Sequence, residues 1–123
     1  KGHHFYMQDF KVNILGSEWS VKFGKETEYP NLKDNDGYAD SSVREIIIDD
    51  FTATEGEPGR KRDIEAYRKQ VICHELIHAF LAESGLDGNG HSADHWEFNE
   101  EMVDWFAIQS PKIFKVFKEL DLL

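Results

Sequence analysis

Alternation of apolar and polar residues near the start of the chain predicts a β-hairpin. Residues 10–15 (FKVNIL) roughly alternate, residues 19–23 (WSVKF) alternate cleanly, and a Gly-Ser pair between them is a turn signal. A β-branched run at residues 44–49 (REIIID) predicts a further, well-buried strand. Residues 30–42 are rich in Pro, Asn, Asp, Gly and Ser, so a long loop is expected there.

The second half of the chain has helical periodicity. Asp63 is a suitable N-cap for a first helix that runs to about residue 84, with Gly85 directly after its end. The centre of this helix, residues 71–81, is apolar nearly all round. A helix without a polar face is typical of the interior of a domain, so we expect this helix to be buried.

Two more helices are predicted after a flexible loop at residues 86–90. Ser92 can cap a second helix that reaches about residue 109, and Ser110-Pro111 has the N-cap and N1 residues of a third helix over residues 112–120. Because strands come first and helices follow, the predicted fold class is α+β. The predicted parts are N-terminal strands at about 10–50, a linker at 54–62 and a helical half at 63–121.

Composition limits the kind of protein that this chain can be. Its 123 residues suit one domain, so residues 1–123 are expected to form a single unit. The net charge of −10 disfavours binding to a phosphate backbone, and one cysteine excludes an internal disulfide framework. No apolar run approaches the ~20 residues of a membrane helix, and no secretory leader is visible. We therefore expect a cytoplasmic protein with no nucleic-acid, membrane or disulfide partner.

The first predicted helix contains His74-Glu75-Leu76-Ile77-His78, which is an H-E-x-x-H motif. The four-residue spacing puts both imidazoles on one helix face, where they can share one tetrahedral Zn²⁺. Glu75 lies about 100° round the helix, next to the metal, as suits a general base for the attacking water. Burial of these polar side chains among apolar residues without a partner would cost several kcal/mol, which favours a metal site over a chance match.

A catalytic zinc site needs a third protein ligand. The extended pattern H-E-x-x-H-x-x-G-x-x-H fails, because Leu81 and Ser84 stand at its Gly and third His positions. Two histidines, His91 and His95, and the carboxylates of the second predicted helix remain as candidates.

Helical winding separates the carboxylates of that helix. Glu100 falls on an apolar, core-facing stripe beside Val103, where a charge needs an ion pair or a metal, while Glu101 is an ordinary solvated acid. Asp104 lies one turn after Glu100, so its carboxylate can accept a hydrogen bond from a ligand histidine and fix the tautomer of that ring.

Residues 99–106 (NEEMVDWF) resemble the Asn-Glu-x-x-x-Asp-x-Phe signature of the thermolysin-like gluzincins. Together with the H-E-x-x-H motif, they make the chain similar to a minimal gluzincin of the ImmA/IrrE-like type, common in phages and prophages. The resemblance implies a zincin-like fold and a zinc metallopeptidase, with His74, His78 and Glu100 as metal ligands and Asp104 as the acid that orients a ligand histidine. It also implies an edge strand at residues 45–49 that holds an extended substrate, such as a phage regulatory protein.

Two other interpretations stay open. Residues 90–96 (GHSADHW) have some similarity to SprT-like zinc proteases, in which a histidine is the third ligand, so His91 or His95 is the alternative ligand. If neither binds metal, one of them can stabilise the transition state, as can Tyr38 or Tyr67. The other interpretation is a zinc-stabilised protein-binding module without catalytic activity. The acidic net charge argues against the DNA-linked role that the SprT resemblance implies.

Overall fold

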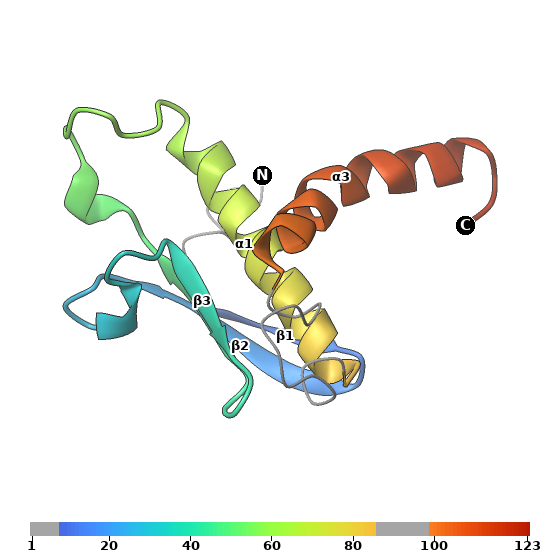
Figure 1. Cartoon of the computed structure of the whole chain (residues 1–123), viewed down its shortest axis with the longest axis horizontal. Coiled ribbons are helices and arrows are strands. Elements are labelled where there is room, and N and C mark those ends of the chain that lie inside the picture. The colour runs from blue at the N-terminus through green and yellow to red at the C-terminus, as the bar shows by residue number, and fades with distance from the viewer. Residues whose placement is uncertain (1–7, 86–98) are drawn as a thin grey trace.

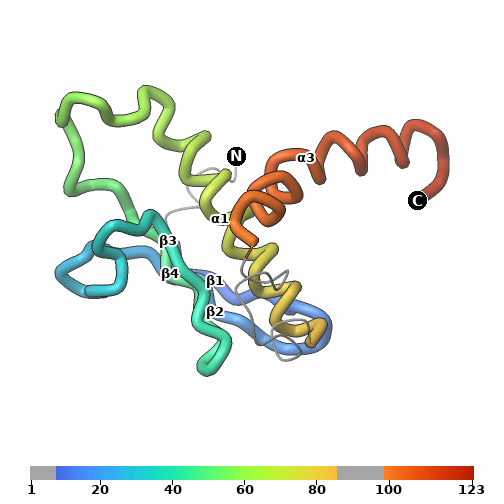
Figure 2. The backbone as a smooth tube through the Cα atoms, viewed as in Figure 1, coloured from blue at the N-terminus to red at the C-terminus, as the bar shows by residue number. Residues whose placement is uncertain are grey.

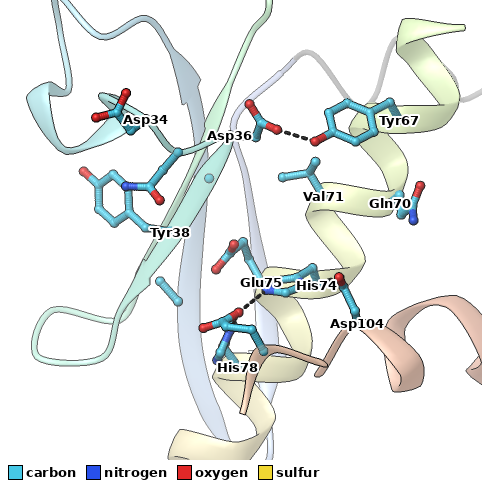
Figure 3. Close-up of a pocket in the computed structure, with 14 residues that line it drawn as sticks. Asp34, Asp36, Tyr38, Tyr67, Gln70, Val71, His74, Glu75, His78 and Asp104 are labelled. Atoms are coloured by element: carbon cyan, nitrogen blue, oxygen red, sulfur yellow. Dashed lines mark hydrogen bonds and ion pairs between the residues drawn. The ribbon is translucent and has the colours of Figure 1, made fainter. Parts of the chain in front are cut away.

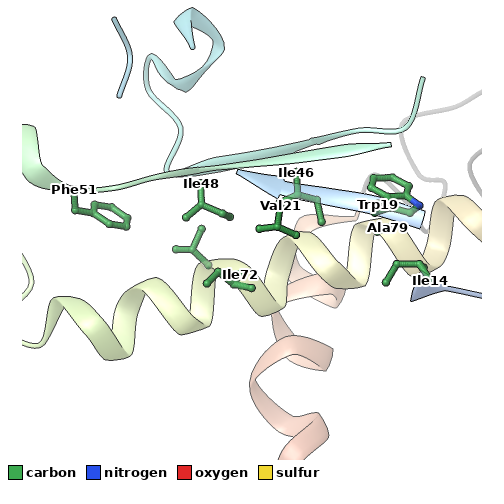
Figure 4. Packing of buried hydrophobic residues seen from close by; sticks show 9 residues of the cluster. Ile14, Trp19, Val21, Ile46, Ile48, Phe51, Ile72 and Ala79 are labelled. Carbon is green, nitrogen blue, oxygen red and sulfur yellow. The ribbon is translucent and has the colours of Figure 1, made fainter. Parts of the chain in front are cut away.

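The computed structural model describes residues 8–85 and 99–123, and within them it shows an α+β arrangement (Figure 1). A four-stranded mixed sheet is covered on one face by helix α1 (Ile64–Glu83). Helix α3 (Glu100–Glu119) contacts α1 on the side away from the sheet (Figure 4). Neither helix is long and apolar enough to cross a membrane, nor is any other among the described residues.

The sheet has the strand order β1-β2-β4-β3. Its strands are β1 (Phe10–Ile14), β2 (Ser17–Gly24), β3 (Gly37–Asp40) and β4 (Glu45–Asp49). β1 and β2 form the predicted antiparallel hairpin, β2 pairs with β4 in parallel, and β3 pairs with β4 antiparallel. The predictions of a hairpin and of a strand at the isoleucine run are therefore confirmed.

The expectation that residues 45–49 form an edge strand is wrong. β4 lies between β2 and β3, and the edge strands are β1 and β3. The region predicted as a long loop holds this strand, preceded by a 3-10 turn at Pro30–Leu32. β3 escapes the pattern because turn-forming residues surround it, and because its Gly37 contributes no side chain to the strand signal.

The hydrophobic core lies between the sheet and α1 (Figure 4). Val21, Ile46 and Ile48 are fully buried and point from the sheet toward Ile72 and Ala79 of α1. This packing explains the nearly all-apolar centre of α1, because the helix has the sheet on one side and α3 on another. It also fixes the rotation of α1, and so decides which side chains face away from the core.

Helix α1 has the ends that its sequence predicts. The Asp63 carboxylate accepts a hydrogen bond from the backbone N–H of Ala66 at 3.1 Å, as an N-cap does. Gly85 follows the helix with φ +92°, the left-handed conformation that glycine adopts without strain. The prediction for this helix is confirmed at both ends.

The prediction of separate second and third helices is wrong, because α3 runs unbroken through Pro111 (Figure 2). The Ser110 hydroxyl donates to the carbonyl oxygen of Phe106 inside the helix and does not cap a new one. Pro111 keeps a helical φ and removes one backbone donor, which a helix survives when its flanks are held. α3 begins with Asn99 as its N-cap, and the predicted helical residues 92–98 lie outside the described residues.

Candidate metal centre

The two motif histidines stand one turn apart on the face of α1 that looks away from the core. Their ring centroids are 4.9 Å apart. His78 is buried, and His74 is partly exposed. The sheet fixes the rotation of α1 and thereby turns both Nε2 atoms toward the start of α3 (Figure 3).

Glu100, the first residue of α3, meets both imidazoles. Its Oε1 atom lies 2.8 Å from Nε2 of His74 and 3.1 Å from Nε2 of His78. Asn99 fixes the start of the helix, since its side chain accepts from the backbone N–H of Met102 at 3.0 Å. One ligand atom from each of His74, His78 and Glu100 lies within 4.8 Å of the others, so this group can hold a metal ion.

The expectation that Glu100 faces the core is wrong in one respect. Its side chain is 66% exposed, whereas Val103 and Ala107 are buried. Because α3 starts at Glu100, no earlier turn of that helix covers the carboxylate. The side chain reaches the imidazoles from the mouth of a pocket, where a metal ion would be accessible to a substrate.

Asp104 lies one turn further along α3 and contacts the other side of the His74 ring. Its Oδ1 atom is 2.6 Å from Nδ1 of His74. Burial lowers the pKa of His74, but the hydrogen bond to Asp104, the charge of Glu75 and the bond to Glu100 outweigh burial, so the net shift is upward. A bound metal would replace the proton at Nε2, and Asp104 would keep the proton at Nδ1.

Glu75 is the buried acid of the site. Its side chain lines the pocket beside the imidazoles, and only 7% of the residue is exposed. Burial raises the pKa of Glu75 to about 7, although the neighbouring histidines lower it. A carboxyl group with this pKa is shared between its protonated and ionised forms at neutral pH, which suits both accepting and donating a proton.

A pocket of about 680 Å³ joins these residues to the edge strand β3. It runs from the imidazoles past Gly37 to Asp36, whose carboxylate accepts a hydrogen bond from the Tyr67 hydroxyl (Figure 3). Burial and the bond to Asp36 raise the pKa of Tyr67 to about 12, so this hydroxyl stays protonated. Asp36 was missed as a pocket residue, because it lies in the segment 30–42 that was predicted as a loop.

Tyr38 and Tyr67, the two tyrosine candidates, are placed differently. Tyr67 stands two turns before His74 on α1 and is engaged with Asp36. Tyr38 borders the pocket from β3, but its ring points away from α1 (Figure 3). The other candidates, His91 and His95, lie outside the described residues, so their roles as ligand or transition-state stabiliser stay predictions.

The arrangement gathers a two-histidine, one-carboxylate donor set at the mouth of an open pocket, with an ionisable acid beside it. Three protein ligands, the number that the described residues 8–85 and 99–123 bring together, would leave one position of a tetrahedral metal ion free. Comparison with family models, curated proteins and solved structures finds no match for this chain. The chemistry of the site therefore follows from its own residues.

Proposed function

We propose that this chain is a zinc-dependent metallopeptidase of the gluzincin kind, with a zincin-like fold, that hydrolyses peptide bonds in a protein substrate. One observation carries the proposal: a single oxygen of Glu100 lies within 3.1 Å of Nε2 of both motif histidines, and the motif acid Glu75 lines the same pocket. Asp104 stands thirty positions after His74 in the chain, yet α3 brings both the ligand Glu100 and the ring-orienting Asp104 to that histidine.

The donor set fits zinc. Two imidazole nitrogens and a carboxylate oxygen suit zinc, whereas calcium and magnesium prefer oxygen ligands alone. A tetrahedral zinc ion with bonds of about 2.0–2.1 Å holds its donors roughly 3.3 Å apart. The Glu100 donor atom lies 2.8 and 3.1 Å from those of the two histidines, and all three donors lie within 4.8 Å of one another, so small side-chain shifts would bring them around one ion.

The roles of the residues follow from their positions. A bound zinc ion supplies Lewis acidity, which acidifies water and polarises a carbonyl group. Glu75, with its pKa of about 7, accepts a proton from the attacking water and later donates it to the leaving amine. Asp104 holds the His74 ring in the tautomer that leaves Nε2 free for the metal.

The substrate of this proposed peptidase would lie along β3. Pairing of a peptide with β4 is ruled out, because residues 46–48 are already paired on both sides, with β2 and with β3. The outer edge of β3 pairs with no strand among residues 8–85 and 99–123, and β3 borders the pocket. An extended peptide added to this edge would pass the imidazoles, as in recognition by β-strand addition.

A matched pair of variants tests the proposal. Glu75→Gln should retain zinc and lose hydrolysis of an unstructured protein substrate by roughly 10²–10⁴-fold, the contribution of a general base. Glu101→Gln, an exposed acid on α3 outside the pocket, should leave the rate unchanged. Equal rates for Glu75→Gln and the wild type would remove Glu75 from the mechanism. A zinc-loaded wild type that cleaves nothing in a broad screen would favour the binding-module interpretation.

A further inference from the structure

Helix α3 carries an apolar seam that continues beyond its contact with α1. Val103 of this helix is fully buried. The positions that follow it at alternating steps of three and four residues are named the α3 seam. This spacing is that of the a and d positions of a coiled coil. The α3 seam consists of Phe106, Ser110, Ile113, Phe117 and Leu120.

The large aromatic and leucine side chains of the α3 seam stay partly exposed although the apolar pattern persists. Val103 is fully buried, whereas Phe106, Phe117 and Leu120 are 37%, 39% and 63% exposed. Phe114, beside the seam, is 56% exposed. The C-terminal half of α3 extends away from α1 and the sheet (Figures 1 and 2). This half of the helix therefore presents large apolar side chains without a partner among the described residues.

The end of α3 is nevertheless well built. Asp121 adopts φ +58°, and the N–H of Leu122 donates to the carbonyl oxygen of Phe117 at 2.9 Å, which closes the helix with a Schellman-type cap. Most of the stability of a helix in a protein comes from packing of its apolar face. A capped helix end with an uncovered apolar face therefore favours a packing partner.

We propose that this partner is a second copy of the chain, with the two α3 helices paired antiparallel about a two-fold axis. With Ile113 opposite Phe117, the small Ser110 lies opposite the large Leu120, so the seam is complementary to itself. Lys112, Lys115 and Lys118 lie on the opposite side of the helix by winding, so pairing does not bring them together.

The size of the exposed surface suits this occupant. Phe114, Phe117, Leu120 and the two final leucines expose roughly 500 Å² of apolar side chain, near the upper limit for a monomer. An ordinary stable interface buries about 800 Å² on each partner. The apolar side chains would supply most of this area, and the polar atoms beside them would supply the rest. A membrane surface is the poorer occupant, because a chain of net charge −10 is repelled by anionic lipid.

Analytical ultracentrifugation of the wild-type chain over a wide concentration range tests the proposal. The wild type should sediment with the mass of two chains, and Phe117→Asp with the mass of one. A second disruptive variant, Ile113→Asp, should do the same, and circular dichroism would show that both remain folded. Lys115→Asp, a charge change on the opposite side of α3, should remain a dimer.

Four results would overturn the proposal. The first is a wild type that is monomeric at every concentration, and the second is a dimer that survives both seam variants. The third is a monomer that floats with anionic lipid vesicles, while the Phe117→Asp variant does not. This result would assign the α3 seam to a membrane surface. The fourth is a monomer in which deletion of residues 1–7 raises hydrogen exchange in residues 112–119. This result would assign the α3 seam to the N-terminal segment.

Discussion

Nδ1 of His74 lies 2.6 Å from Oδ1 of Asp104, while Nε2 of the same ring lies 2.8 Å from Oε1 of Glu100. Both carboxylates come from the first two turns of α3, so one helix holds the ring at both nitrogens. The metal centre is thus a junction between α1 and α3. Its geometry depends on the packing of these two helices as much as on the H-E-x-x-H motif.

Replacement of Asp104 should weaken metal binding without abolishing it. Asp104→Asn removes the charge that favours a proton at Nδ1 of His74, and the loss of such an outer contact costs ~10–100-fold in metal affinity. Competition with a chromogenic chelator would measure the change. The imidazoles bond to Asp104 and Glu100 and not to Glu101 of the same helix, so the metal affinity of Glu101→Gln should match that of the wild type. Equal affinities for Asp104→Asn and the wild type would contradict the role of Asp104.

The buried acid Glu75 should make the metal-free protein less stable at alkaline pH. Its folded-state pKa is raised from 4.5 to about 7, so the folded state binds this proton more tightly than the unfolded state does. The free energy of unfolding therefore falls as pH rises from about 4.5 to about 7, by an upper bound of about 3 kcal/mol.

Glu75→Gln removes this titration and should unfold at higher urea concentration than the wild type at pH 8, with chelator present. Near pH 4, where Glu75 is mostly protonated in both folded and unfolded states, the two proteins should have similar stability. Glu101→Gln serves as the exposed control and should show no such pH-dependent difference. A difference in stability that is constant from pH 4 to pH 8 would contradict the raised pKa.

Gly37 allows β3 to approach α1 closely. A Cβ atom at this position would lie 3.0 Å from Cγ1 of Val71 and 3.1 Å from the carbonyl oxygen of Ile47. Gly37→Ala should therefore lower the free energy of unfolding by about 1–3 kcal/mol, the usual cost of overpacking. In a Val71→Ala background the added methyl group should cost less, and a double-mutant cycle from urea unfolding would measure the difference. Strict additivity would mean that the two side chains do not meet.

The sequence predicted those elements whose structure is set by residues within them or directly next to them. The hairpin has a turn signal between two alternating strands, and α1 has Asp63 as a cap and Gly85 as a terminator. These features act within a few residues, so the sequence alone reveals them. The sequence also favoured Glu100 over His91 and His95 as the partner of His74 and His78, and the structure places Glu100 with both histidines within reach of one metal ion.

Features that depend on distant contacts were missed. β3 is a strand because β4 offers it a partner, as in the pairing of Tyr38 with Ile47, and nothing in residues 30–42 announces that pairing. The position of β4 inside the sheet follows from the same pairing. Pro111 resembles a helix start, but α3 continues through it. The exposure of Glu100 likewise depends on where α3 begins. The sequence predicted a helix that Ser92 caps, whereas α3 begins at Glu100.

The zinc content of purified protein tests the central claim most directly. Wild-type protein and the neighbouring control Glu101→Ala should each hold about one zinc ion per chain, and Glu100→Ala should lose it, because two imidazoles alone bind zinc weakly. Zinc retained in Glu100→Ala but lost in His91→Ala or His95→Ala would contradict the account and make a histidine the third ligand. A folded wild type that takes up no zinc would contradict the metal centre itself.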